Sequence, residues 1–183
     1  MKQWKLTTID MALISLFAVL IAVCAWIAIP SAVPFTLQTF GLFATLGLLG
    51  GKRGTLAVLL YLLLGLVGIP VFSSFRGGFG VLAGITGGYL IGFLFAALLY
   101  WAITRRHTES LWRSALGMAA GMLLDYAFGT AWFMLFYAKA YGAIGLGAAL
   151  SMCVFPFIVP DLIKIALALT LTQTLPKRLK GLR

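Results

Sequence analysis

The sequence predicts an all-α polytopic membrane protein with six transmembrane helices, built as a single domain over residues 1–183. Hydrophobic residues make up 62% of the chain and charged residues only 10%, whereas a soluble domain has about 25% charged residues. Long apolar segments alternate with short polar connections, and basic residues gather in every second connection. Such a chain buries its apolar surface in lipid, so we expect a multi-pass protein of the cytoplasmic membrane.

Six apolar segments are long enough to be considered as spans. The second and third are shorter than the ~20 residues of a perpendicular helix, so we expect them to be tilted or covered by neighbours. Gly50 and Gly51 separate these two, Pro30 ends the first, Pro70 the third and Pro176 the sixth. The predicted spans cover residues 9–29, 37–49, 56–69, 81–103, 115–137 and the stretch from the end of the glycine-rich segment 142–147 to Thr174.

The distribution of basic residues predicts that both termini lie in the cytoplasm. With six spans and the N-terminus inside, the outer loops contain only Arg76 and Lys139, and Lys164 lies within the sixth span. Positive residues favour the cytoplasmic side of a membrane protein. The inner segments hold the other eleven of the fourteen Lys and Arg residues, namely Lys2, Lys5, Lys52, Arg53, Arg105, Arg106, Arg113, Lys177, Arg178, Lys180 and Arg183.

Three charged residues lie inside predicted spans and are the first candidates for a functional site. Asp125 lies in the middle of the fifth span, and Asp161 and Lys164 lie in the sixth. A charge at the centre of a bilayer costs about 2.5–3.5 kcal/mol on insertion scales, so such side chains face a cavity or a partner. Asp161 and Lys164 are three residues apart and can also neutralise each other as a structural pair. For Asp125 we favour a structural role within the bundle.

The sequence argues against several other classes of protein. The phosphate-loop pattern GxxxxGK[ST], the HExxH pattern and CxxC do not occur, so we expect no metal site, no cofactor, no enzymatic activity and no ATP hydrolysis by this chain. Cys24 and Cys153 lie in apolar runs and are interpreted as core residues. The basic charge indicates membrane orientation rather than a nucleic-acid partner. Residues 11–29 are too long for a cleaved signal peptide.

Four stretches together resemble one known family. They occur in the family's order, and the length and the six spans also agree. The stretches are VPFTLQTFG (33–41), GIPVFSSFRGGFGVLAGITGGYLIGF (68–93), YAFGTAW (126–132) and PFIVPDLIK (156–164). They resemble the BioY family of biotin transporters, which are substrate-binding (S) components of energy-coupling factor (ECF) transporters.

The resemblance implies high-affinity binding of biotin and its uptake across the bacterial cytoplasmic membrane. ATP would be used only by a partner ATPase, which a coupling subunit connects to the S component, unless the chain acts alone. An S component for a different small vitamin is the alternative, although VPFTLQT and PDLIK resemble the biotin branch. Association into a homo-oligomer stays open.

The chemistry of biotin then suggests roles for individual residues. Its ureido group has two N–H donors and one carbonyl acceptor, its rings and chain are apolar, and a carboxylate ends the chain. Asp161 is an acceptor and Lys164 a donor on the same helix face, while Pro156 and Pro160 favour a broken helix beside a cavity. The expected polar contacts are Asp161, Lys164, Arg76, Gln38 and Thr36, and the expected walls are Phe35, Phe75, Tyr89 and Trp132.

A row of small residues marks one face of the first span. Ser15, Ala18, Ala22 and Ala25 fall on a single helix face, and such a row allows close helix packing within the bundle. In S components the first helix carries an Ala-xxx-Ala motif that docks the coupling subunit. The resemblance therefore implies a docking role for Ala18 and Ala22, and packing inside the bundle is the alternative.

Overall fold

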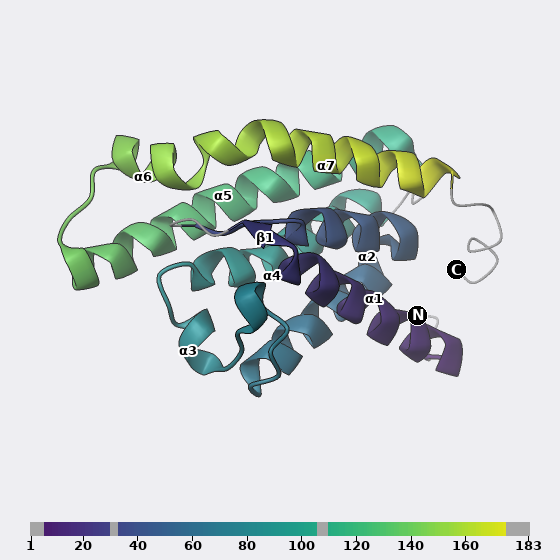
Figure 1. Cartoon of the computed structure of the whole chain (residues 1–183). Coiled ribbons are helices and arrows are strands. Elements are labelled where there is room, and N and C mark those ends of the chain that lie inside the picture. Colours follow the sequence, from purple (N-terminus) through teal and green to yellow (C-terminus); the bar gives the residue numbers. More distant parts are fainter. Residues whose placement is uncertain (1–5, 30–32, 106–109, 175–183) are drawn as a thin grey trace.

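The computed structural model describes residues 6–29, 33–105 and 110–174, and these form a bundle of helices (Figure 1). Five helical segments of the described chain are long and apolar enough to cross a membrane. The elements in chain order are α1 (Thr8–Trp26), β1 (Ala28–Ile29), β2 (Phe35–Thr36), α2 (Gln38–Leu66), the 3-10 turn η1 (Ser73–Phe75), α3 (Phe79–Leu82), α4 (Gly87–Thr104), α5 (Leu111–Tyr141), α6 (Leu146–Cys153) and α7 (Phe155–Thr174).

Helix α2 consists of two arms that meet at a break. Gly50 has non-helical angles, φ 78° and ψ 169°, which glycine adopts at little cost. A Cβ added to Gly54 would lie 3.0 Å from the Cα of Leu46, so the chain turns back on itself between these positions. The predicted interruption at Gly50-Gly51 is confirmed as a break, although the second arm ends at Leu66 rather than at residue 69.

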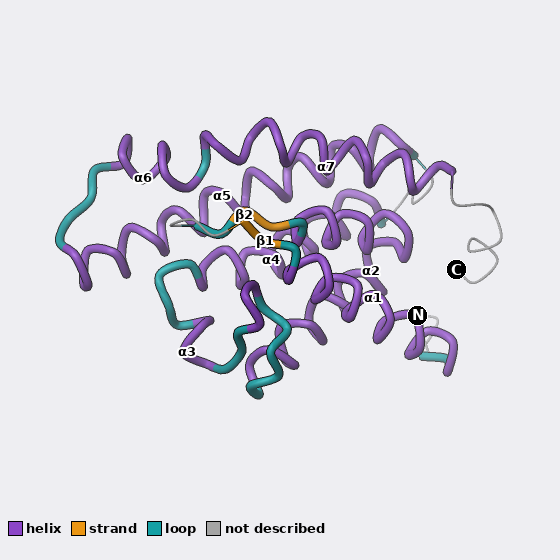
Figure 2. The backbone as a smooth tube through the Cα atoms, viewed as in Figure 1, coloured by secondary structure: helices purple, strands orange, loops and turns teal. Residues whose placement is uncertain are grey.

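The segments between the helices contain structure that the sequence did not reveal. The antiparallel pair β1–β2 joins Ala28 with Thr36 (Figure 2), so the all-α prediction needs this small correction. The predicted start of the fourth span at residue 81 is also wrong, because α3 ends at Leu82 and α4 begins only at Gly87. The chain folds back tightly here: a Cβ on Gly87 would meet the carbonyl group of Leu82.

A buried ion pair ties the start of α1 to the turn of α2. Asp10 forms a capping box with Thr7, and its Oδ1 lies 2.6 Å from Nη2 of Arg53. The N-terminal end of α1 and the basic turn 52–53 therefore lie at the same end of the bundle. The sequence predicts that these two segments lie on the same side of the membrane; the basic residues of the two termini lie outside the described residues.

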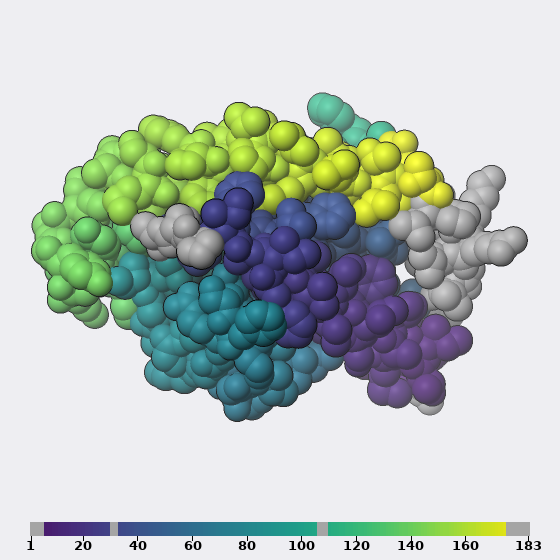
Figure 3. Space-filling view, viewed as in Figure 1, coloured from purple at the N-terminus to yellow at the C-terminus, as the bar shows by residue number. Residues whose placement is uncertain are grey.

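The distribution of apolar side chains fits a protein surrounded by lipid. Aromatic residues such as Phe43, Tyr61 and Tyr100 fill the interior, while large apolar residues on the outer faces of α5 and α7, including Leu135 and Val159, are about two-thirds exposed. In Figure 3, the C-terminal part of the chain (green to yellow) forms the upper part of the face, and the part from α1 to the teal segment that contains α3 forms the lower part. The few buried charged side chains, Asp10, Asp125, Asp161 and Lys164, are therefore unusual in this interior.

Candidate binding site

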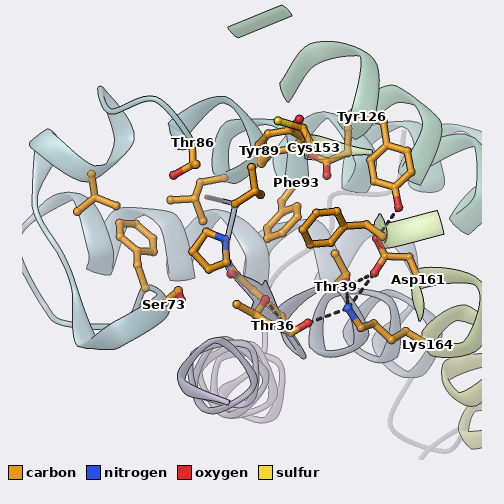
Figure 4. A pocket seen from close by; sticks show the side chains of 18 of the residues that line it. Thr36, Thr39, Ser73, Thr86, Tyr89, Phe93, Tyr126, Cys153, Asp161 and Lys164 are labelled. Carbon is orange, nitrogen blue, oxygen red and sulfur yellow. Dashed lines mark hydrogen bonds and ion pairs between the residues drawn. The ribbon is translucent and has the colours of Figure 1, made fainter. Parts of the chain in front are cut away.

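A cavity opens among α2, the 72–86 segment, α4, α5 and α7 (Figure 4). Its open space, including the mouth that faces solvent, is about 720 Å³. Its polar lining is Thr36, Gln38, Thr39, Ser73, Arg76, Thr86, Tyr89, Asp125, Tyr126, Cys153, Asp161 and Lys164, and its apolar lining is Val33, Pro34, Phe72, Val81, Leu90, Phe93 and Phe157. The cavity thus combines apolar walls with a few charged groups.

Asp161 and Lys164 form an ion pair at one side of the cavity. They are 2% and 5% exposed, and Nζ of Lys164 lies 2.8 Å from Oδ1 of Asp161. The pair lies in the first half of α7, which begins at Phe155 after the chain leaves helical geometry at Val154. The sequence predicts a helix broken by Pro156 and Pro160; the irregular residue is instead Val154, just before them, and α7 continues through Pro160, which has no N–H to donate.

Further hydrogen bonds fix the carboxylate of Asp161. Thr39 donates from Oγ1 to Oδ1 at 2.9 Å, and Tyr126 donates from its hydroxyl to Oδ2 at 2.6 Å. With Lys164, three elements of the bundle converge on one carboxylate. Such charge-assisted hydrogen bonds are about twice as strong as neutral ones, so the position of this acceptor is well defined.

The ammonium group of Lys164 is fully occupied by the protein itself. It donates to the carbonyl oxygen of Thr36 at 2.7 Å, to Oγ1 of Thr39 at 3.0 Å and to Asp161. It also lies 4.6 Å from the ring centroid of Phe35. An ammonium group has three N–H donors, so a ligand gains a hydrogen bond from Lys164 only by displacing one of these partners.

Asp125 differs from Asp161 because its carboxylate is not satisfied. It is 5% exposed and lines the cavity, yet its Oδ1 is buried without a hydrogen-bond partner among the described residues. An added Cβ on Gly92 would meet this oxygen, so the glycine provides the space that Asp125 occupies. A buried acceptor without a donor is costly, and a ligand N–H would satisfy it.

The structure places the expected ligand contacts in two groups. Thr36, Gln38, Arg76, Tyr89, Asp161 and Lys164 line the cavity, whereas Phe35, Phe75 and Trp132 do not. Gln38 donates to the hydroxyl of Tyr61 at 2.7 Å, and Tyr89 shares a hydrogen bond of 3.0 Å with Thr130.

The three aromatic residues outside the lining have other contacts. Phe35 stacks on Phe157, which itself lines the cavity. Phe75 is 63% exposed and stacks on Trp26 at a centroid distance of 5.0 Å, away from the cavity. Trp132 donates from its indole N–H to the carbonyl oxygen of Gly84 at 2.9 Å. None of these three side chains lines the cavity, so their predicted contact with the ligand stays a prediction.

The expected docking face of α1 is buried in this structure. Ala18 and Ala22 are 1% and 3% exposed and belong to the main core cluster. These side chains pack inside the bundle, so they offer no open surface to a partner. This burial is what the packing alternative expects, and the docking role of Ala18 and Ala22 stays a prediction.

Several lining residues were not singled out from the sequence. Thr39 and Tyr126 bind Asp161 across 122 and 35 residues of chain, and Ser73, Thr86 and Cys153 complete the polar lining. Thr39, Ser73, Thr86 and Tyr126 all lie within the four family-like stretches, so motif membership was a usable signal for them. Among the described residues, no group of three or more acidic, His or Cys side chains could hold a metal ion.

Comparison with known proteins gives consistent matches along the chain. The model of the BioY family matches residues 1–181. The Biotin transporter BioY of Thermotoga maritima is 43% identical over 164 residues, which cover 88% of this chain and 92% of the relative. The Probable biotin transporter BioY of Pyrococcus horikoshii is 36% identical over 170 residues, covering 91% and 95%. A crystal structure of the S-component for biotin from an ECF-type ABC transporter superposes with a TM-score of 0.80 at 26% identity, covering 92% of this chain and 91% of that one.

Proposed function

Because the chain belongs to the BioY family, we propose that it binds biotin inside the cytoplasmic membrane and serves in biotin uptake. The observation that carries the proposal is the pair of buried carboxylates beside one cavity, Asp161 held by its neighbours and Asp125 with an unsatisfied oxygen. A ligand with two N–H donors on a compact apolar body fits this arrangement.

The ureido head of biotin matches this side of the cavity. Its two N–H groups need acceptors, and carboxylates are acceptor-only groups when ionised. Asp125 and Asp161 both line the cavity, so each is assigned one ureido N–H. Phe93, Leu90 and Phe157 provide apolar wall for the rings.

Direct binding of biotin to the purified protein tests the proposal. Radiolabelled biotin should bind saturably, and unlabelled biotin should displace it while riboflavin and thiamine should not. Displacement by another vitamin at lower concentration than biotin would instead favour the alternative, an S component for a different small vitamin. Failure to bind any of the three would contradict the proposed function.

ECF partners are the second part of the proposal. A relative in structure is the S-component of an ECF-type ABC transporter, so a coupling subunit and ATPase subunits are the expected partners of this chain, and ATP would be used by them alone. Because Ala18 and Ala22 are buried, docking would use other residues of α1 or other helices unless α1 repacks. Transport by the chain alone remains the alternative, and uptake in cells with and without the ECF subunits distinguishes the two.

Six spans with both termini in the cytoplasm complete the proposal. The break at Gly50 divides α2 into two arms, which adds one span to the five long helices. Single cysteines at the two ends of α5 test the orientation, since Trp112 is 76% exposed and Tyr141 is 72% exposed. In a background without Cys24 and Cys153, an impermeant thiol reagent added outside intact cells should label Tyr141→Cys but not Trp112→Cys. Labelling of Trp112→Cys but not Tyr141→Cys would mean that the protein has the opposite orientation. As a control, both variants should be labelled in permeabilised cells.

Gly92 should be essential for the position of Asp125. In Gly92→Ala the new Cβ meets Oδ1 of Asp125, so the carboxylate must turn away. A hydrogen bond to a charged group is worth about 1.5–3 kcal/mol, so losing it corresponds to roughly ten- to over a hundredfold weaker biotin binding if Asp125 is a ligand contact. The melting temperature should change little, because alanine favours helix over glycine by about 1 kcal/mol.

Gly147→Ala is the matched control for this substitution. Gly147 lies in helix α6, and an added Cβ there meets nothing within 4 Å. This variant should bind biotin with unchanged affinity. Unchanged affinity in Gly92→Ala as well would show that the position of Asp125 does not matter for the ligand.

A further inference from the structure

Trp26, the last residue of α1, contacts a turn of the chain that lines the cavity. The turn consists of residues 72–76, of which Phe72, Ser73 and Arg76 belong to the lining. The indole N–H of Trp26 donates to the carbonyl oxygen of Pro70, just before the turn, at 2.9 Å. Its ring stacks on Phe75, within the turn, at a centroid distance of 5.0 Å. The structure describes all of α1, and none of its residues lines the cavity, so Trp26 holds this segment from outside.

The backbone of the turn has a conformation that needs such support. The N–H of Phe72 donates to the carbonyl oxygen of Arg76 at 2.9 Å and closes the turn. Between them, Ser74 and Phe75 have φ angles of 59° and 56°, a left-handed conformation that non-glycine residues rarely adopt. Residues in this conformation cost free energy and persist only where the surrounding structure enforces it. The shape of the turn therefore depends on its contacts with the rest of the chain.

The core of the bundle supports only one side of the turn. Phe72 is 1% exposed, and its ring meets that of Tyr61 edge-on at a centroid distance of 5.5 Å. Phe75 is 63% exposed, and among the described residues its one ring–ring contact is the stack on Trp26. The left-handed part of the turn is thus held from α1 rather than from the core.

The left-handed residues decide which side chains of the turn reach the cavity. Ser73 and Arg76 flank them and line the cavity, whereas Phe75 points away from it. Nε of Arg76 donates to the carbonyl oxygen of Ser73 at 3.3 Å, so the two lining residues are also connected across the turn. If Ser74 and Phe75 relaxed to ordinary angles, the chain would continue in another direction and the two lining residues would move.

An alternative role for Trp26 is to anchor the end of α1 at the membrane surface, where tryptophan is common. Its exposed fraction of 36% suits such an anchor. An anchor, however, needs no fixed partner within the protein, and Trp26 has a hydrogen bond and a ring contact on the same segment. These two contacts favour a role in shaping the cavity.

We propose that Trp26 is a positioning residue for ligand binding, which holds the left-handed turn and thereby keeps Ser73 and Arg76 in the wall of the cavity. The assignment rests on the proposed binding of biotin, and it does not depend on which part of the ligand meets this wall. It makes the affinity for the ligand depend on the position of α1, a helix that does not line the cavity.

Biotin binding to purified variants of Trp26 tests the proposal. Trp26→Ala should weaken binding about tenfold, because a ring stack and a neutral hydrogen bond to the turn are both lost. Trp26→Phe keeps a ring but not the N–H, and it should weaken binding only about threefold. Trp112→Ala is the matched control, since it removes a tryptophan that is 76% exposed near the start of α5 and does not line the cavity. This control should bind biotin with unchanged affinity.

A substitution inside the turn distinguishes positioning from anchoring. Glycine adopts left-handed angles without a steric penalty, so a turn with Ser74→Gly should need less support from Trp26. Combined with Trp26→Ala, this substitution should restore part of the lost affinity, while Ser74→Gly alone should bind biotin at least as tightly as the wild type. The loss of a membrane anchor would not be compensated by a glycine at position 74.

The outcomes separate this assignment from the proposed function. Melting temperatures establish that each variant is folded. Unchanged affinity in folded Trp26→Ala, an equal loss in Trp112→Ala, or no recovery with Ser74→Gly would overturn the positioning role. If Trp26→Ala does not fold, Trp26→Phe with and without Ser74→Gly provides the same comparison. Absence of biotin binding to the wild-type protein would instead contradict the proposed function itself.

Discussion

Asp161→Asn is expected to reduce both the stability of the protein and its affinity for biotin. The carboxylate receives hydrogen bonds from Thr39, Tyr126 and Lys164, whereas the amide has one acceptor oxygen and an NH₂ group that would face one of these donors. Removing one partner of a buried ion pair costs about 3–5 kcal/mol of stability. The loss of a charged acceptor for a ureido N–H should weaken biotin binding by more than about tenfold.

The double variant distinguishes a ligand contact from a structural pair. Asp161→Asn combined with Lys164→Met is neutral and removes the unpaired ammonium group, so part of the lost stability should return. If Asp161 only compensates Lys164, biotin binding should return as well. If Asp161 accepts a ureido N–H, as we propose, binding should stay weak in the double variant. Melting temperature and biotin affinity of the two single variants and the double variant decide between these outcomes.

Asp10 provides the matched control for this pair of experiments. It forms the other buried ion pair of the described chain, with Arg53, at the end of the bundle where α1 begins, and it does not line the cavity. Asp10→Asn should lower the melting temperature without changing the affinity for biotin. A comparable loss of affinity would mean that binding reports general loosening of the bundle rather than the contact at Asp161.

Hydropathy and charge were sufficient to predict most of the helices, because the requirement for an apolar span of a given length is local in sequence. The break at Gly50 was predictable for the same reason. The stretch 81–86 was misassigned because its apolar and glycine residues resemble a span in composition, while its fold depends on the close contact of Gly87 with Leu82. The pair β1–β2 joins strands of only two residues each, too short to leave a periodic pattern.

The site was predictable where a residue type is unusual in its surroundings. Asp161 and Lys164 are conspicuous as charges within an apolar span, and the structure pairs them beside the cavity. The direction of a side chain was not predictable. Phe75 points outward because Ser74 and Phe75 have left-handed backbone angles, and no sequence pattern indicates such angles there. Ala18 and Ala22 were ambiguous for a related reason, because small residues permit close packing both within a bundle and between proteins.

Asp125 shows the limit of sequence reasoning most clearly. A structural role was favoured for it, on the expectation that a neighbour in the bundle would satisfy its carboxylate. In the folded chain, however, Oδ1 is buried without a partner among the described residues and faces Gly92 beside the cavity. The distinction depends on which groups α4 and α7 bring next to α5, and it arises only from the packing of the three helices.

Asp125→Asn should therefore behave differently from Asp161→Asn. The protein gains no hydrogen bond to Oδ1 in the absence of ligand, and an unpaired buried charge is costly, so replacing it with a neutral amide of the same shape should leave the melting temperature unchanged or raise it. The amide can still accept through its oxygen, but without the charge and with an NH₂ group that competes for the same space. We expect biotin binding to weaken by roughly ten- to over a hundredfold, the range of a hydrogen bond to a charged group.

Opposite changes in stability and affinity would identify Asp125 as a residue whose carboxylate is retained for the ligand. A carboxylate that served the fold would give a fall in melting temperature on the same substitution, as expected for Asp161. Thermal melting of Asp125→Asn with and without saturating biotin separates the two cases: the variant should melt at or above the wild-type temperature alone, and biotin should stabilise it less than it stabilises the wild type. If biotin stabilised the variant as much as the wild type, neither ureido N–H group would bind Asp125, because stabilisation by a ligand depends on its affinity for the folded state.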